Sequence, residues 1–491
     1  MLNLNTVLIT FIVVLGVGVA GMLIRKKYDI RVVLFGTGIF FMLGAAALGL
    51  SILPEESSSG ILFFDVFRQI GNTFVGQLSG AGLIIMMLFG FSAYMSEIGA
   101  NGMTVKVLSA PLLKIKNKRM IVPVFFLIAS SLCMIIPSAS NLGALLMATA
   151  FPALVKAGVS PLTSAAMIAM AAGVAPTPLG SDNVVIHGYL DMSLNEFVFG
   201  HHALVSIPVI LVLCVVQYFW QGYCDARLTK TKVESRWSNP TVTSTSSVSL
   251  ISAHDRKDGE QTFSRNAVTL EGNEKKVPLF YAVLPMLPLI FMIVFTILEA
   301  LGYTTASLQL VELTFVALLI AVVVDGLTRK KAEASIGAVK SFFTGMSTGF
   351  VTVVVQVVAA MTFISGLRVL GVIDGLSAFT SDVVGGGWMA IIVFCLLIVA
   401  VGLISGTGLS LFMGLIPVIP LFAYDAEVSA VTMMISMQFT AHFVKTISPL
   451  APVMIITSGM MNVSPIELAK RTVVPSVIGA TLSILLAYVL F

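Results

Sequence analysis

The chain has 491 residues, of which 57% are hydrophobic and only 11% are charged. Its mean hydropathy is +1.01, and several apolar runs reach the roughly 20 residues that cross a bilayer, which excludes a soluble protein. The net charge of +4 comes from bases that are spread over many polar breaks, so no basic stripe for nucleic acid is expected. We therefore predict an all-α polytopic membrane protein.

Ten full spans and two re-entrant hairpins are predicted along the chain. The hairpins cover about residues 120–157 and 388–423. No base precedes the first apolar run, and Arg25, Lys26 and Lys27 follow it, which is typical of a retained first span rather than of a cleaved signal peptide. The full spans cover about residues 5–23, 32–50, 79–98, 161–190, 203–221, 279–298, 309–326, 347–365, 428–460 and 473–490.

Basic residues are concentrated in every second loop of this layout, on one predicted side of the membrane. The predicted outer loop 51–65 carries Glu55, Glu56 and Asp65 but no base. The excess of bases on one side obeys the positive-inside rule, so we expect a multi-pass protein of the bacterial inner membrane with both termini outside, in the periplasm. Of the 28 Lys and Arg residues, 24 fall in the predicted inner loops 24–31, 100–119, 222–278, 327–340 and 461–472.

One inner segment, 228–276, differs in composition from everything around it. It is rich in Ser and Thr and carries scattered charges, so it cannot bury enough apolar surface to fold. We predict a flexible cytoplasmic linker there, between a first repeat at 1–227 and a second repeat at 277–491.

The two halves resemble each other at an offset of about 270 residues. Pro176 and Pro449 each interrupt an apolar span, and Gly99 and Gly371 each follow one. Each half has about five full spans, an odd number, plus one hairpin, so the second half must run inverted relative to the first. Inverted repeats with broken helices are typical of secondary transporters, whose site lies near the midplane of the bilayer.

Polar interruptions in four apolar segments are the candidate site. They are the tips of the two hairpins and the breaks in spans 161–190 and 428–460. Pro and Gly leave backbone N–H and C=O groups free, and in hydrocarbon such groups survive only where they face protein or a wet cavity. Free N–H groups at helix N-termini suit a carboxylate. The predicted substrate-binding residues are Ser138, Ser140, Asn141, Thr177, Ser405, Thr407, Lys445, Thr446 and Ser448.

Two deep charges flank the broken spans. Lys445 is predicted to be the counter-charge for a substrate carboxylate, and Asp182, with Ser181 and Asn183, is predicted to hold a coupling ion, Na⁺ or H⁺. A structural salt bridge between Asp182 and Lys445 is the alternative. His187 and His442 lie near the broken spans, and we expect them to be packing residues, with a proton relay as the alternative. His201 and His202 lie at an outer edge and are expected to have no catalytic part.

Enzyme chemistry is not expected. No nucleophile–base set is visible, the four cysteines have no spacing of a metal site, and no glycine loop carries the Lys-Ser/Thr tail that cradles phosphates. We predict a protein that is not an enzyme and binds neither a metal nor an organic cofactor.

Several stretches resemble the DcuC family of anaerobic C4-dicarboxylate carriers, over nearly the whole chain. The most specific are MMLFGFSAYM at 86–95 and QYFWQ at 217–221. The others lie at 98–101, 145–149, 175–177, 447–449 and 470–472, with Pro475. The resemblance implies a secondary carrier for small organic anions, such as succinate and fumarate, that works by uptake, efflux or exchange. A carrier for amino acids or other carboxylates, or an ion channel, stays an alternative.

The family is similar in plan to a wider ion-transporter superfamily that includes sodium-coupled dicarboxylate carriers. This likeness implies a homodimer in which a transport domain, built from hairpins and broken helices, moves like an elevator against scaffold helices. Ser140 and Asn141 match the start of the superfamily's Ser-Asn-Thr motif, in which Leu142 replaces Thr, and Thr407 belongs to a looser match at the second tip. The resemblance also implies an acid near Asp182 and a base at Lys445.

Overall fold

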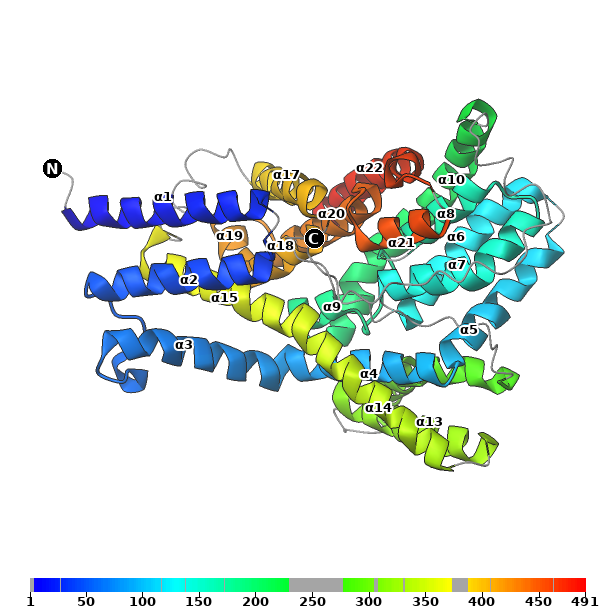
Figure 1. The fold of residues 1–491 in the computed structure, drawn as a ribbon, viewed down its shortest axis with the longest axis horizontal. Coiled ribbons are helices and arrows are strands. Elements are labelled where there is room, and N and C mark those ends of the chain that lie inside the picture. The colour runs from blue at the N-terminus through cyan, green and yellow to red at the C-terminus, as the bar shows by residue number, and fades with distance from the viewer. Residues whose placement is uncertain are drawn as a thin grey trace, which may run out of the picture. The chain divides into compact units, whose positions relative to one another are not determined.

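The chain is described by a computed structural model, in which every regular element of the described residues is a helix (Figure 1). Among these residues, 13 helices are long and apolar enough to cross a membrane. The prediction of an all-α polytopic membrane protein is therefore confirmed. The described residues are 4–26, 28–115, 117–136, 138–171, 173–228, 277–303, 308–329, 332–372, 387–406, 408–461 and 463–491. The predicted linker at 228–276 lies almost wholly outside them.

The helices follow the predicted order. The first half contains α1 (Leu4–Arg25), α2 (Ile30–Ala47), η1 (Glu55–Ser57), α3 (Leu62–Gln77), η2 (Leu78–Gly82), α4 (Leu83–Glu97), α5 (Ala100–Ser109), η3 (Ala110–Lys114), α6 (Lys118–Ile135), α7 (Ala139–Lys156), α8 (Pro161–Ala171), α9 (Ser181–His187), η4 (Glu196–His202) and α10 (Ala203–Leu228). The second half contains η5 (Leu279–Met286), α12 (Leu287–Ala300), α13 (Leu310–Arg329), α14 (Ala332–Gly349), η6 (Phe350–Val354), α15 (Val355–Val369), α17 (Gly387–Ser405), α18 (Gly408–Leu415), η7 (Ile416–Val418), α19 (Ile419–Asp425), α20 (Ala430–Ile447), α21 (Pro452–Met461) and α22 (Pro465–Leu490).

Two predicted spans lie within longer helical stretches. The spans expected at 79–98 and 347–365 belong to Leu62–Glu97 and Ser335–Val369, of 36 and 35 residues. The first stretch is kinked at Gly80, where the predicted span begins, and the helix before the kink, α3, was not predicted because polar residues lower its hydropathy. In α3 the buried residues Val66, Ile70 and Thr73 recur every three or four positions, so one apolar stripe is enough to hold the helix.

The predicted interruptions are present. Helix α6 ends at Ile135 and α7 begins at Ala139, at the predicted tip of the first hairpin. Helix α17 ends at Ser405 and α18 begins at Gly408, at the predicted tip of the second. The two predicted broken spans are α8 with α9, and α20 with α21. Whether the hairpins are re-entrant stays a prediction.

Contacts divide the chain into two compact units, and each unit takes segments from both sequence halves. The first unit contains α1, α2, most of α3 and most of α15. Phe41, Ala45 and Leu370 form its buried core. A Cβ atom added to Gly38 would lie 2.5 Å from the backbone nitrogen of Phe363, so α2 approaches α15 as closely as a glycine allows.

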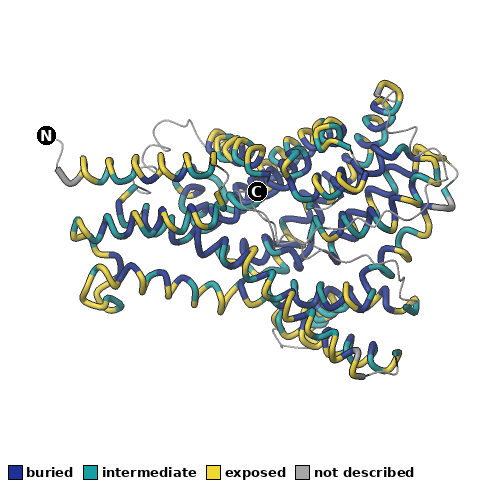
Figure 2. Tube along the Cα trace, viewed as in Figure 1, coloured by how far each residue is buried: buried dark blue, intermediate teal, exposed yellow. Residues whose placement is uncertain are grey.

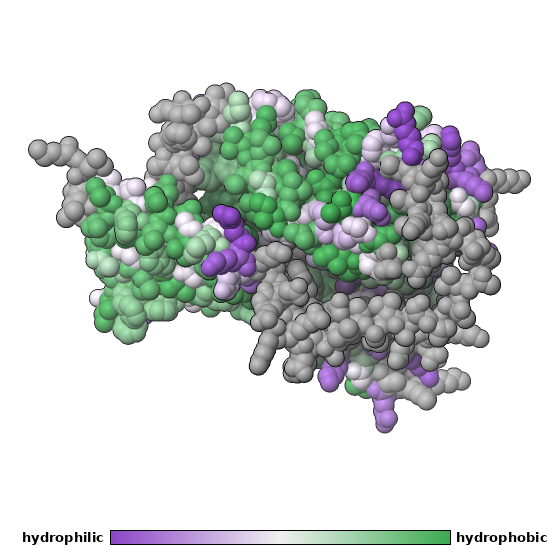
Figure 3. All heavy atoms as spheres, turned by 45° about the horizontal axis from the view of Figure 1, so that its top comes forward, coloured by the Kyte–Doolittle hydropathy of each residue, from purple (hydrophilic) through white to green (hydrophobic). Residues whose placement is uncertain are grey.

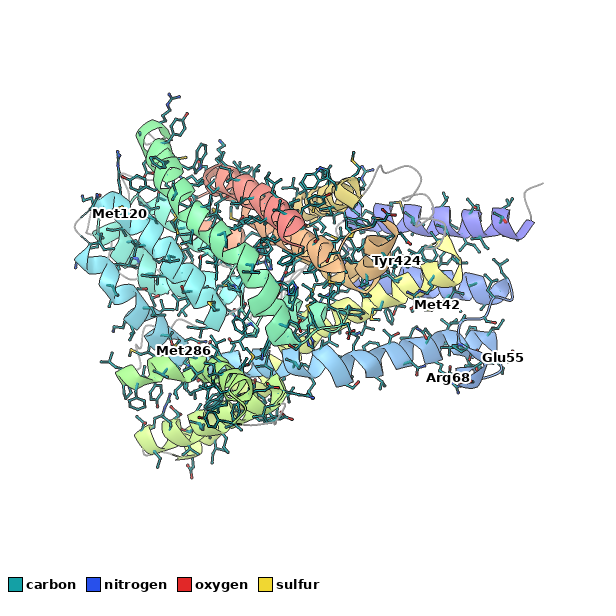
Figure 4. All side chains as sticks on the ribbon, turned by 180° about the vertical axis from the view of Figure 1, so that it is seen from behind. Met42, Glu55, Arg68, Met120, Met286 and Tyr424 are labelled. Carbon is teal, nitrogen blue, oxygen red and sulfur yellow. The ribbon has the colours of Figure 1, made fainter. Side chains whose placement is uncertain are left out.

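Side-chain hydrogen bonds tie the connection before α3 in the first unit, where Figure 4 labels Glu55 and Arg68. Arg68 donates to the carbonyl of Ser57 at 2.9 Å, and Asp65 accepts from the Ser58 hydroxyl. At the other end of α2, Asp29 caps the helix by accepting from the backbone N–H of Arg31 at 2.9 Å. Hydrogen bonds from the Arg31 side chain lower the pKa of Asp29, because they stabilise its ionised form.

The second unit is built around two buried helices, α8 and α20. Every residue of α8 is buried, as is every residue of α20 from Val431 to Val444 (Figure 2). Helix α20 packs against α8, α17, α18, α19, α21 and α22. Large apolar side chains such as Phe219 remain exposed elsewhere, and hydrophobic residues cover much of the face that Figure 3 shows, as expected for a surface in lipid.

Structural details recur in the two halves at the predicted spacing. The π-helical segments η2 and η6 occupy 78–82 and 350–354, so each position of η6 lies 272 residues after its counterpart. Gly99 and Gly371, which are also 272 residues apart, both adopt positive φ, 83° and 69°. A third π segment, η4, has no counterpart at this offset, because the corresponding residues belong to α22, so the repeat stays a prediction.

Helices α4 and α14 of the second unit pack through glycines. A Cβ atom on Gly345 would lie 2.5 Å from the carbonyl oxygen of Phe89, and one on Gly90 would lie 2.8 Å from Phe342. Gly349 lies one turn after Gly345 and faces Phe89 as well. These glycines let the two backbones meet with the spacing of small residues that is typical of membrane helix pairs.

We predict that Gly345→Leu destabilises the α4–α14 pair, because its side chain has no space beside Phe89. Overpacking of this kind costs about 1–3 kcal/mol, so the thermal unfolding midpoint of the detergent-purified protein should fall. Gly337→Leu on the same helix is the matched control, since a Cβ atom added there would have no neighbour within 4 Å. Equal midpoints for the two variants would contradict the close packing.

Candidate functional site

The candidate site in the second unit is a chain of buried polar side chains centred on Asp182. This residue lies in the first turn of α9, directly after the break that follows α8, and is only 7% exposed. Its Oδ2 atom accepts from Gln438 Nε2 at 2.6 Å and lies 2.6 Å from His442 Nε2. Gln438 also donates to Asn183 Oδ1 at 2.6 Å. The carboxylate therefore bridges the first broken span to α20.

Lys445 joins this chain through His442 rather than directly. Its Nζ lies 2.9 Å from His442 Nδ1. Since the ionised Asp182 carboxylate can only accept, the imidazole proton belongs on Nε2, which leaves Nδ1 as the acceptor for the Lys445 ammonium. Gln438, His442 and Lys445 lie four and three residues apart, so they share one face of α20. The arrangement is an acid and a base bridged by one neutral imidazole.

Gly173 in the first break makes room for this chain. A Cβ atom there would lie 2.8 Å from both Lys445 Nζ and His442 Nδ1, and the residue has φ +147°. Both facts favour glycine, which alone lets the backbone approach the ammonium so closely. The backbone of the first break therefore packs closely against the end of α20.

Hydroxyl groups in the two breaks cap the hairpin helices in the same way. Thr177 Oγ1 donates to the carbonyl of Met134 at the end of α6, at 2.7 Å. Ser448 Oγ donates to the carbonyl of Leu403 at the end of α17, at 3.2 Å. Carbonyls in the last turn of a helix lack intrahelical partners, so these bonds satisfy groups that lipid could not.

The four predicted interruptions therefore lie together within the second unit. The first hairpin meets the first break through Thr177, and the second hairpin meets the second break through Ser448. A Cβ atom on Gly406 would lie 2.5 Å from the carbonyl oxygen of Leu450, which shows how closely the second tip packs. The bonds of Asp182 then connect the two pairs.

The other predicted residues take less central places. Ser138 caps α7 by accepting from the backbone N–H of Asn141 at 3.4 Å, Ser140 is half-buried, and Asn141 is exposed. Thr446 lies 2.7 Å from the hydroxyl of Ser476 on α22 and also donates to its own helix at Phe443.

Four predicted residues complete the set. Asn183 donates to the carbonyl of Thr177 at 2.7 Å, which closes the first break. Ser181 and Ser405 are half-buried at the start of α9 and the end of α17. Thr407 lies outside the described residues.

Two residues in the chain of polar contacts were not predicted, and a third was misplaced. Gln438 was overlooked, and His442, which was expected to pack, instead bonds Asp182. Their spacing from Lys445 on one helix was the available signal. His202, expected at an outer edge, is only 2% exposed, and its ring centroid lies 4.9 Å from that of Phe439.

A second buried charge, Arg471, ties α22 to α8 and α10. It is 1% exposed, pairs with Asp225 and donates to Thr163 Oγ1 at 2.8 Å. Its carbonyl accepts from Trp220 Nε1 at 2.9 Å and from Gln221 Nε2 at 3.1 Å. That carbonyl is free because Pro475, four residues later, has no N–H to donate.

We predict that Arg471→Met lowers stability, because Asp225 loses its cation and Thr163 loses a donor. Because the Asp225 side chain is 34% exposed and water can partly solvate it, we expect a loss of about 1.5–3 kcal/mol, the usual range for a hydrogen bond to a charged group. Denaturant unfolding of the purified protein measures the loss. Lys470→Met, at the exposed neighbouring position, is the control and should change little. A stable Arg471→Met protein would show that the pair does not hold these helices.

Among the described residues, no group of three or more His, Cys, Asp and Glu side chains is arranged to hold a metal ion. A cavity of about 190 Å³ lies elsewhere, beside Lys118, Arg119 and Asp225. Around Asp182 the described residues offer hydrogen-bonding groups, the base Lys445 and two imidazoles, His442 in direct contact and His202 through an electrostatic interaction.

Comparison with known proteins agrees with this architecture. The sequence profile described as DcuC, C4-dicarboxylate anaerobic carrier, matches residues 6–491. The anaerobic C4-dicarboxylate transporter DcuC of Escherichia coli K12 is 28% identical over 473 residues, which cover 96% of this chain and 94% of that protein. A relative from Vibrio cholerae, also named for DcuC, is 30% identical over 461 residues, which cover 94% of this chain and 93% of that protein.

Two solved structures share the fold. MtrF of Neisseria gonorrhoeae, described with a class of antimetabolite efflux pumps, has a TM-score of 0.55 at 13% identity and covers 94% of both chains. The YdaH transporter of Alcanivorax borkumensis has a TM-score of 0.59 at 15% identity and covers 94% of this chain and 98% of its own. The fold is thus that of membrane transporters, and the family profile over nearly the whole sequence shows that this chain belongs to the DcuC family.

Proposed function

We propose that the protein is a secondary active transporter of C4-dicarboxylates such as succinate and fumarate. Membership of the DcuC family and the names of its relatives support this substrate class. The observation that carries the proposal is the bridged acid–base chain of Asp182, His442 and Lys445, which lies where two broken helices and two hairpin tips meet. A buried charge in a membrane segment is by default a functional residue.

Lys445 is proposed to bind a substrate carboxylate. Its ammonium has three donors, and His442 Nδ1 uses one of them. The free backbone groups of the breaks, with the hydroxyls of Ser138, Ser140 and Ser405, would contribute neutral donors for the rest of the dianion. Neutral donors keep binding weak enough for release, which a carrier needs.

Alternating access is proposed to arise from two inverted repeats. The π segments and the left-handed glycines at a common offset support the repeat. The matching caps by Thr177 and Ser448 support it as well. Since Gln438 and Asp182 are buried, substrate can reach them only if a part of the protein moves. An elevator-type motion within a homodimer meets this need.

The coupling ion is proposed to bind at Asp182, either as Na⁺ or as H⁺. Asn183 and the half-buried Ser181 flank it. Gln438 Oε1 is buried without a partner among the described residues, so it offers Na⁺ an additional oxygen. We propose a bacterial inner-membrane location with both termini outside.

A carrier for amino acids or other carboxylates is the second candidate. Asp182 and Lys445, which are bridged by the imidazole of His442, could also bind the ammonium and the carboxylate of a zwitterion. Labelled succinate flux in proteoliposomes, with amino acids as competitors, separates the two. An ion channel would show neither saturation nor counterflow.

We predict that Lys445→Ala lowers succinate counterflow by about 30-fold or more, because loss of a desolvated charge partner costs at least about 2 kcal/mol. Lys470→Ala, an exposed lysine, should transport normally. If Lys445 serves only as a salt-bridge partner, then Lys445→Met combined with Asp182→Asn should restore flux. Restored flux would therefore remove Lys445 from substrate binding.

We predict that Asp182→Asn retains succinate exchange but loses net uptake driven by an ion gradient, because Asn keeps the hydrogen bonds and lacks the charge. Uptake is measured with Na⁺ and pH gradients applied separately. The control is Asp191→Asn, at an exposed acid. Gradient-driven uptake at the wild-type rate would take Asp182 out of coupling.

A further inference from the structure

We propose that His442 carries the coupling proton, which it takes up at Nδ1 when a substrate carboxylate draws Lys445 away from the ring. This inference rests on the proposed function, since it assigns a step to the same site. It differs from the assignment of Asp182 as the ion ligand, because the proton would reside on the imidazole and Asp182 would orient it.

The geometry leaves one nitrogen of the ring for this task. His442 Nε2 lies 2.6 Å from Asp182 Oδ2 and, as the donor, already carries a proton. Nδ1 holds the remaining lone pair, which faces Lys445 Nζ at 2.9 Å. While the ammonium donates to Nδ1, the ring has no position left for a second proton. Lys445 therefore blocks protonation as long as the site is empty.

A substrate carboxylate competes with His442 for the ammonium. A hydrogen bond from an ammonium to a carboxylate is stronger than one to a neutral nitrogen, so Lys445 turns to the substrate. His442 Nδ1 is then a buried acceptor without a partner, which is costly. A hydronium ion from solvent gives its proton to Nδ1, so one O–H bond breaks, one N–H bond forms and water is left, and Asp182 holds the resulting imidazolium at Nε2.

Charge also favours joint binding of the proton and a dicarboxylate. The empty chain contains one carboxylate, one ammonium and a neutral ring, so its net charge is zero. With the proton bound and Asp182 still ionised, its net charge is +1, so it attracts a dianion more strongly than the neutral chain does. In a buried site the attraction between these charges is only weakly screened. Substrate and proton therefore favour each other's binding, and the linkage must be reciprocal.

Other titratable groups face His442 and must be considered as rivals. Asp182 faces it from α9 and Lys445 from its own helix. His202 of η4 interacts electrostatically with His442, and its Nδ1 has no partner among the described residues. Cys133 of α6 lies near Lys445.

The helices α17 and α22, which also pack against α20, present different neighbours. Cys395 of α17 interacts with Thr440 rather than with His442. From α22, Thr472 and Ser476 meet Thr446 with neutral hydroxyls. His202 is therefore the rival proton carrier that an experiment has to separate.

The test measures proton uptake on binding. Full-length protein in detergent, in weakly buffered Na⁺-free solution, is mixed with succinate while a dye records pH, and equilibrium dialysis with labelled succinate gives the amount bound. We expect the wild type to take up about one proton per bound succinate. His442→Gln, whose amide can still donate to Asp182, should bind succinate more weakly and without proton uptake, which is measured at succinate concentrations high enough to fill the site. His201→Gln, a control whose ring lies against the carbonyl of Glu196 instead, should behave as the wild type.

The outcomes distinguish this inference from the proposed function. If the wild type binds no succinate, the proposed substrate is wrong. If it binds succinate without taking up a proton, the role of His442 is overturned while the function stands, and this result does not depend on any variant folding. Uptake that persists in His442→Gln and disappears in His202→Gln would assign the proton to His202 instead.

Discussion

The structure depends on one constraint: an acid and a base inside an apolar bundle must each find a partner. Burying an ion costs several kcal/mol unless its hydrogen bonds are satisfied, and no water is available in hydrocarbon to help. Asp182 and Lys445 meet this demand through His442, which lets two residues from different sequence halves share one neutral chain of contacts. The buried positions of α8 and α20 around that chain follow from the same need.

The broken helices solve a related problem for the backbone. Each break exposes carbonyls and amides, and the protein satisfies them with hydroxyls from the opposite element: Thr177 for α6 and Ser448 for α17. Pro475 shows the same principle at a distance, because the carbonyl that it leaves free receives two donors from α10. These side-chain hydrogen bonds satisfy the backbone groups of the irregular segments and also hold neighbouring helices together.

Sequence alone predicted the helical class, the interruptions and the two deep charges, since hydropathy, proline, glycine and ionisable residues act locally. It did not predict α3, because the polar residues of this helix lower its mean hydropathy although Val66, Ile70 and Thr73 form a buried stripe on one face. It also predicted a packing role for His442, because the role of an imidazole on an apolar helix can be inferred only when its hydrogen-bond partner is known. Asp182 is 260 residues away in sequence, and no local pattern reports a contact at that distance.

The neutrality of the empty site bears on how such a carrier could work. Asp182, His442 and Lys445 satisfy each other, so the protein can close without substrate and without a stranded charge. A substrate must replace one of those bonds, and the free energy it gains is reduced by the bond that it breaks. Under the proposed function, this exchange would limit affinity and favour release. A site with a free, permanently exposed ammonium would bind a dianion more tightly and would move it more slowly, because dissociation would limit the cycle.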